Sequence, residues 1–79
     1  MPTLLFLNGF LFFFYSNENE EPIHVHVTKG EAIGKLWLEP NIDIVYLRGF
    51  TSKEENQILK IVNDRAESFK NKWNEYFTK

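Results

Sequence analysis

The sequence predicts an α+β fold, in which an antiparallel β-meander sheet of four to five strands packs against one long C-terminal helix. Short segments rich in β-branched and aromatic residues, separated by turn signals, come first, and a single amphipathic helical pattern follows. Strands that precede one helix are typical of a two-layer domain, and 79 residues suffice for one such domain. We therefore expect a single domain over residues 1–79, with strands at about 3–7, 10–16, 23–28, 32–38 and 42–47 and a helix at about 52–77.

The first two strands are predicted from Asn8-Gly9, which separates two apolar runs. Both residue types tolerate the positive φ of a type I′ turn, so this pair indicates a β-hairpin. A membrane helix needs about 20 apolar residues, whereas this run is interrupted at Asn8-Gly9 and ends at Ser16. The first basic residue is Lys29, so the start does not resemble a secretory signal. With no cysteine in the chain, we expect a cytoplasmic protein without a membrane segment.

A second hairpin is predicted because residues 23–28 alternate between apolar and polar side chains and Gly30-Glu31 can form its loop. A two-residue loop sets His24 opposite Trp37. The next two pairs are then Val25 with Leu36 and His26 with Lys35. One face of the hairpin then carries the apolar side chains Ile23, Val25, Val27, Leu36 and Leu38. The other face carries His24, His26, Lys35 and Trp37.

The long helix is predicted from apolar residues spaced three and four apart, from Ile58 to Phe77. Ser52 followed by Glu55 fits a capping box, in which each side chain bonds a backbone N–H at the start of the helix. The predicted N-cap is therefore Ser52. The same stripe contains Trp73, which we expect in the core.

The aromatic content predicts an interface. Eight Phe, three Tyr and two Trp are many for 79 residues, and the second strand is apolar on both of its faces. One helix covers one face of a sheet, so Phe10, Phe12 and Phe14 can belong to the core while Leu11, Phe13 and Tyr15 need a second cover. We expect a homodimer or a cognate small protein on this second face. The alternative is that the sheet curls and that Tyr46 and Leu47 cover it.

His24-Val25-His26 is the one compact chemical signal. Side chains at i and i+2 of a strand project from the same face about 6.5–7 Å apart, so both imidazoles could bind one divalent metal ion, with Glu20 or Glu21 as a further ligand. The same pair could instead act as general acid and base in phosphodiester or RNA cleavage, with Lys35 holding a negative charge. A purely structural role is the third interpretation: His24 would pack on Trp37, and His26 would cap the loop.

Trp37 lies on the predicted histidine face, where it could stack on a base of single-stranded RNA. The charge argues against strong binding. The net charge is −2, and residues 52–79 carry six basic and five acidic side chains. No phosphate-binding loop, dinucleotide-binding glycine motif, hydrolase nucleophile motif or zinc-protease motif is present, and the absence of Cys excludes thiolate chemistry.

Several motifs in order resemble one family. They are Met-Pro-Thr at the start, Phe14-Tyr15-Ser16, His24-Val25-His26-Val27, Gly30-Glu31-Ala32, Lys35-Leu36-Trp37-Leu38-Glu39-Pro40, Gly49-Phe50 and Trp73-Asn74-Glu75-Tyr76-Phe77. Over essentially the whole chain the sequence resembles the prokaryotic family known as domain of unknown function 4160. Ile23 departs from the pattern, because the family usually has a second proline there. The resemblance implies a small cytoplasmic protein, often encoded beside another short protein and suspected to be a toxin–antitoxin component. It assigns no activity and no catalytic residue.

The leading hypothesis is therefore a partner-binding component of a toxin–antitoxin-like pair. The alternative is a small metal-dependent or acid–base enzyme using the His-x-His strand, and the lower alternative is a weak RNA-binding module. We favour a protein without enzymatic activity. A divalent metal is the one cofactor considered, and it belongs to the enzyme hypothesis.

Overall fold

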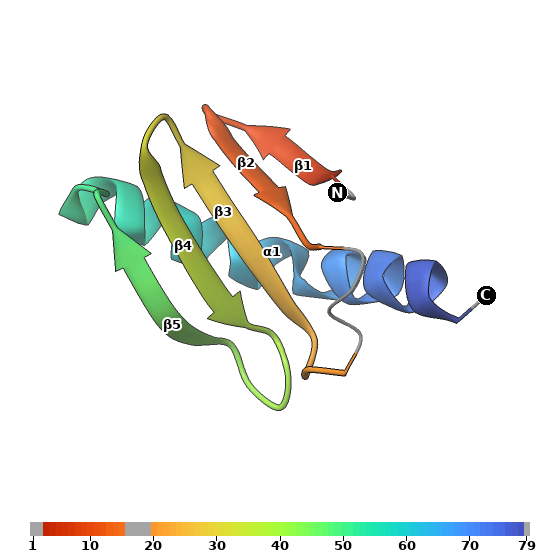
Figure 1. Cartoon of the computed structure of the whole chain (residues 1–79). Coiled ribbons are helices and arrows are strands. Elements are labelled where there is room, and N and C mark those ends of the chain that lie inside the picture. Colours follow the sequence, from red (N-terminus) through yellow and green to blue (C-terminus); the bar gives the residue numbers. More distant parts are fainter. Residues whose placement is uncertain (1–2, 16–19, 79) are drawn as a thin grey trace.

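A computed structural model describes residues 3–15 and 20–78 of the chain. Five antiparallel strands follow one another across one sheet in chain order, and helix α1 crosses behind it (Figure 1). This arrangement confirms the predicted α+β class. The elements are β1 (Thr3–Leu7), β2 (Phe10–Phe13), β3 (His24–Lys29), β4 (Ala32–Trp37), β5 (Asp43–Arg48) and α1 (Ser52–Phe77). Strand β2 ends three residues earlier than predicted, and the predicted last residue, position 16, lies outside the described residues.

The β1–β2 turn has the backbone that its sequence predicts. Asn8 and Gly9 both have positive φ, at 54° and 84°, as a type I′ turn requires. A bulge interrupts the pairing between Thr3 and Leu5. On β1, the carbonyl oxygen of Leu4 accepts a hydrogen bond from Lys72 Nζ of α1 at 3.0 Å. This bond joins the edge strand β1 to the helix.

The β3–β4 hairpin has the predicted register, with His24 opposite Trp37, Val25 opposite Leu36 and His26 opposite Lys35. Strand β5 departs from simple alternation. It pairs Tyr46 with Lys35 and Ile44 with Leu36, which leaves Val45 as the extra residue of a β-bulge.

The helix N-cap lies one residue before the predicted one, so the prediction of Ser52 was wrong. The Thr51 hydroxyl accepts from Glu54 N–H at 3.1 Å, and the Glu54 carboxylate accepts from Thr51 N–H at 2.9 Å, which completes a capping box. Glu54 also pairs with Lys29 Nζ at 2.9 Å. The hydrogen bond from the Thr51 backbone, followed by that from Lys29, lowers the pKa of Glu54 below its ordinary value.

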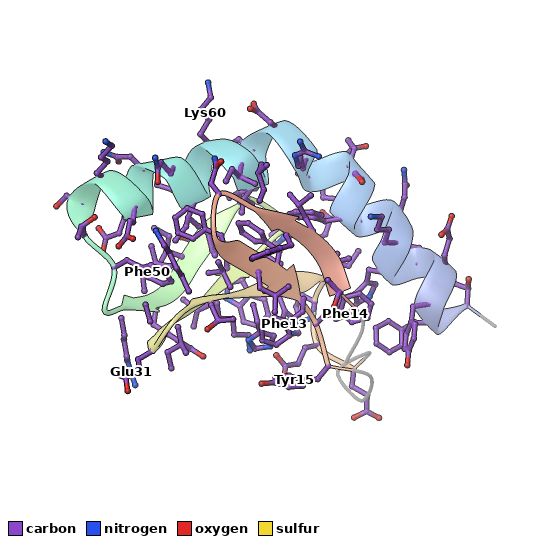
Figure 2. The ribbon with its side chains drawn as sticks, turned by 90° about the horizontal axis from the view of Figure 1, so that it is seen from above. Phe13, Phe14, Tyr15, Glu31, Phe50 and Lys60 are labelled. Carbon is purple, nitrogen blue, oxygen red and sulfur yellow. The ribbon has the colours of Figure 1, made fainter. Side chains whose placement is uncertain are left out.

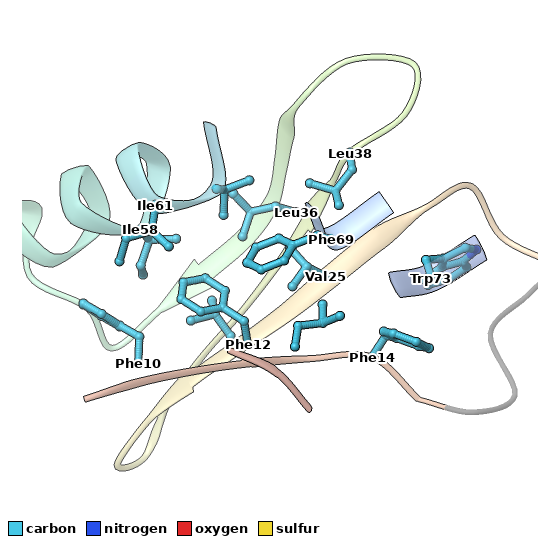
Figure 3. Close-up of a cluster of buried hydrophobic side chains, with 13 residues drawn as sticks. Phe10, Phe12, Phe14, Val25, Leu36, Leu38, Ile58, Ile61, Phe69 and Trp73 are labelled. Carbon is cyan, nitrogen blue, oxygen red and sulfur yellow. The ribbon is translucent and has the colours of Figure 1, made fainter. Parts of the chain in front are cut away.

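The core lies between the sheet and α1 (Figure 3). Phe10, Phe12 and Phe14 are all fully buried there, as the strand parity predicts. Trp73 is also buried, and its ring lies 4.9 Å from that of Phe14. The rest of the buried apolar cluster is Leu4, Val25, Val27, Leu36, Leu38, Ile58, Ile61, Val62 and Phe69.

Over the described residues, α1 is the sole helix, and it is too polar to span a lipid bilayer.

Candidate functional site: the uncovered face of the sheet

The sheet has one face packed on α1 and one face that no other described element covers (Figure 1). We call the second one the uncovered face. The pairing places Leu11 and Phe13 of β2 opposite Thr28 and His26 of β3 on this face. Figure 2 shows Phe13 and Tyr15 on the side of the sheet away from α1. Further members, assigned from the register of β1, β4 and β5, are Phe6, Ile33, Lys35, Trp37, Asp43, Tyr46 and Arg48. His24 has the same register parity, but its side chain is buried against α1.

Aromatic rings gather around His26 on this face. The imidazole of His26 is stacked on the Phe13 ring, with centroids 5.4 Å apart and planes at 20°. The Tyr15 ring meets His26 edge-on at 4.8 Å and meets Phe13 at 5.4 Å. These contacts hold Phe13 in place and leave its side chain only 8% exposed. His26 therefore packs between two aromatic rings.

His24 is fully buried. The pairing of β2 with β3 ends at Phe13 and His26, so His24 lies beyond the last pair, where its ring contacts Trp73 of α1 at 5.1 Å. Its ring also meets Trp37 edge-on at 5.5 Å. Nδ1 lies 2.9 Å from the carbonyl oxygen of Pro22. A carbonyl can only accept, so Nδ1 carries a proton in this contact.

Lys35 is held between an acid and an aromatic ring. Its Nζ is 2.8 Å from a Glu21 carboxylate oxygen and lies over the Trp37 ring at 4.7 Å from the centroid. The same Glu21 oxygen is 3.9 Å from His24 Nδ1. The structure therefore brings four of the predicted site residues, His24, Lys35, Trp37 and Glu21, into one contact network.

The predicted metal ligands are not all gathered. Glu20 is exposed. Over residues 3–15 and 20–78, no three His, Asp or Glu side chains converge as metal ligands would. His24 and His26 meet edge-on at 5.1 Å between ring centroids.

The three predicted interface residues differ in exposure. Leu11 is half-buried and Phe13 is held under its neighbours, whereas Tyr15 is 45% exposed. Two further apolar side chains extend the uncovered face, namely Phe6 at 70% and Ile33 at 44% exposure. Neither residue was predicted as part of the interface. Strand parity within each hairpin could have found them, since Phe6 pairs with Leu11 and Ile33 with Thr28.

The β5 end of the uncovered face carries a second cation–aromatic pair. The Arg48 guanidinium lies 5.0 Å from the Tyr46 ring centroid. Tyr46 and Leu47 were predicted together as an alternative cover for this face. The structure separates them, because Tyr46 pairs opposite Lys35 whereas Leu47 pairs opposite Gly34 and packs against the core.

A separate groove of about 620 Å³ lies on the other side of the molecule, between the β1–β2 turn and α1. Leu7, Asn8, Ile61 and Arg65 are among its lining residues. It shares no residue with the uncovered face, and none of its lining residues was predicted as a site residue.

Fold and site together define a small two-layer α+β module with an open aromatic sheet face. The chain belongs to the family described as Domain of unknown function (DUF4160), whose model matches residues 9–74. This confirms the resemblance found in the sequence. No curated protein and no solved structure matches the chain.

Proposed function

We propose that this protein is the partner-binding component of a toxin–antitoxin-like pair, and that its uncovered face binds the cognate protein. The observation that carries the proposal is the exposure of Phe6, Tyr15 and Ile33 on the sheet face that no other described element covers. A sheet with apolar side chains on both faces gains stability when a second layer covers it. Exposed apolar patches rimmed by polar groups commonly mark protein interfaces.

The composition of the uncovered face suits a protein ligand. Aromatic residues and arginine are enriched at interfaces, and Tyr and Arg dominate the residues that contribute most to binding. Tyr15 and Arg48 both lie on this face and are exposed. We expect the partner to present an apolar segment over the Tyr15–Phe13 pair.

The burial of His24 favours binding over catalysis. Acid–base cleavage of a phosphodiester requires both imidazoles to contact the substrate, and His24 has no exposed surface. Lys35 is engaged by Glu21 at 2.8 Å, which leaves it less suited to hold a phosphate. The enzyme and RNA-binding hypotheses remain predictions of lower rank. We expect the pairing to take place in the cytoplasm, since a chain without cysteine depends on no oxidising compartment.

The proposal is tested by co-expressing the chain with the short protein encoded beside it and measuring the affinity of the purified pair. Leu11→Lys and Tyr15→Lys should each weaken binding by at least tenfold, because each puts a charge into the apolar centre of the interface. Asn71→Lys is the matched control, since it adds the same charge on an exposed position of α1. Absence of a complex, or equal affinity for the face variants and the control, would contradict the proposal.

A further inference from the structure

The two edge strands of the sheet differ in their contacts with the other described elements. At the β1 edge, α1 supplies Lys72 to the Leu4 carbonyl. The outer edge of β5 has no strand or helix hydrogen-bonded to it among the described residues. Ile44 and Val45 of this strand are each 42% exposed. An unprotected edge with exposed β-branched residues is a template for pairing with another strand.

The bulge in β5 decides which of its residues share a face. Asp43 pairs with Trp37 and Arg48 pairs with Ile33, so both point to the uncovered face although they are five positions apart. Ile44 pairs with Leu36 and Leu47 pairs with Gly34, which places both on the face toward α1. Without the bulge, alternation would send the two members of each set to opposite faces.

This arrangement makes β5 complementary to itself. In an antiparallel pair of β5 strands related by a two-fold axis, Asp43 of each copy can lie opposite Arg48 of the other. The same register places Ile44 opposite Leu47, and each of these pairs is on one face, as cross-strand pairs must be. Opposite charges then meet at both ends, and the apolar side chains meet between them.

We propose that a second copy of this chain binds along β5 in this register. Five strands from each copy then form one continuous sheet, with both helices on one side and both uncovered faces on the other. Bulges often discourage edge pairing. In β5 the bulge instead brings the charged and the apolar pairs onto matching faces. A two-fold axis makes the interface closed, so pairing stops at two copies.

The test uses the complete chain and two charge variants. Sedimentation equilibrium over a concentration series should show a monomer–dimer equilibrium for the wild type. Asp43→Arg and Arg48→Asp should each weaken dimerisation by about tenfold or more, because like charges then lie opposite at both ends of the strand pair. Arg65→Asp is the control for net charge, since it changes an exposed residue of α1 and should leave dimerisation unchanged.

A mixing experiment separates pairing from loss of folding. Equal amounts of the Asp43→Arg and Arg48→Asp variants should form a heterodimer about as tightly as the wild type forms its homodimer, because each cation again faces an acid. Tyr15→Lys should leave dimerisation intact, which distinguishes this proposal from the binding of a cognate protein on the uncovered face. A wild type that stays monomeric at millimolar concentration would overturn the proposal. So would a dimer that the single variants do not weaken, or a mixture that fails to recover pairing.

Discussion

Replacing Gly34 by alanine should destabilise the fold through one added methyl group. Gly34 lies on the helix-covered face of β4, between Val27 of β3 and Leu47 of β5. A Cβ at Gly34 would lie 2.5 Å from Leu47 Cδ2, 2.9 Å from Val27 Cγ1 and 3.2 Å from the Tyr46 carbonyl oxygen. The Leu47 side chain can rotate away. Val27 is β-branched and buried, and the Tyr46 oxygen belongs to the backbone, so neither yields easily.

The magnitude follows from two opposing effects. Overpacking a well-packed site by a methyl group costs about 1–3 kcal/mol. Alanine also restricts the unfolded chain, which returns about 0.4–1 kcal/mol. The net loss in the free energy of unfolding should be about 1–2 kcal/mol, which corresponds to a fall in Tm of about 5–15 °C for a domain of this size.

Urea unfolding followed by tryptophan fluorescence measures this loss, because Trp73 is buried in the core. The protein concentration must be equal in all samples, since self-association would add to the apparent stability. In a Val27→Ala background the contact with Val27 Cγ1 is absent, so the same substitution at Gly34 should cost about 1 kcal/mol less. A Gly34→Ala protein as stable as the wild type with an unchanged m-value would refute the steric reasoning, as would equal costs in the two backgrounds.

Three further predictions concern the helix cap and the division of aromatic residues. Thr51→Ala should lower the free energy of unfolding by about 1 kcal/mol, because it removes the N-cap acceptor. Urea unfolding measures this loss, with Ser52→Ala as the control. A larger loss for Ser52→Ala would show that Ser52 is the N-cap. The pKa of Glu54 is lowered in the folded state, so its stabilising effect should be present above the ordinary value of 4.5 and lost as the pH falls through the lower folded-state pKa. Glu54→Gln should therefore flatten the acid side of the stability–pH curve, and an identical curve for the variant would contradict this assignment. Phe12→Ala should cost about 3–5 kcal/mol, whereas Phe6→Ala, at a 70% exposed side chain, should change thermal stability little; similar losses for the two would contradict the assignment of faces.

Much of the sheet could be predicted because its signals are local. Asn8-Gly9 specifies a turn by its backbone preference, and the two-residue loop at Gly30-Glu31 then sets the register that places His24 opposite Trp37. The cap could not be decided in this way. Thr51 with Glu54 and Ser52 with Glu55 both fit the capping-box pattern. The first pair forms the box, and Lys29 from the end of β3 binds the Glu54 carboxylate, a contact between residues far apart in sequence.

The candidate site also depends on contacts between residues that are far apart in sequence. Period-two alternation correctly placed His24 and Trp37 as neighbours, yet it also suggested an accessible histidine pair. The ring that closes over His24 belongs to Trp73, near the end of α1, and no local pattern connects the two positions. In β5 the bulge at Val45 changed which side chains share a face. No sequence signal marks the extra residue of this bulge. The sequence therefore could not predict that Asp43 lies on the uncovered face.

The uncovered face divides into a part that is already buried and a part that retains exposed surface. Phe13 is packed under His26 and Tyr15, so binding a partner there costs little additional side-chain entropy. Tyr15 and Phe6 retain exposed surface and can bury more of it against a partner. Phe13→Ala should therefore reduce both the stability of the free protein and its affinity for the partner, because it removes the support beneath the binding surface. Tyr15→Ala should reduce the affinity by a similar factor with a much smaller loss of stability. Thermal unfolding of each free variant, together with calorimetric titration of the partner, separates the two effects. Equal losses of stability for the two variants would show that Tyr15 is part of the folding core and not of the interface.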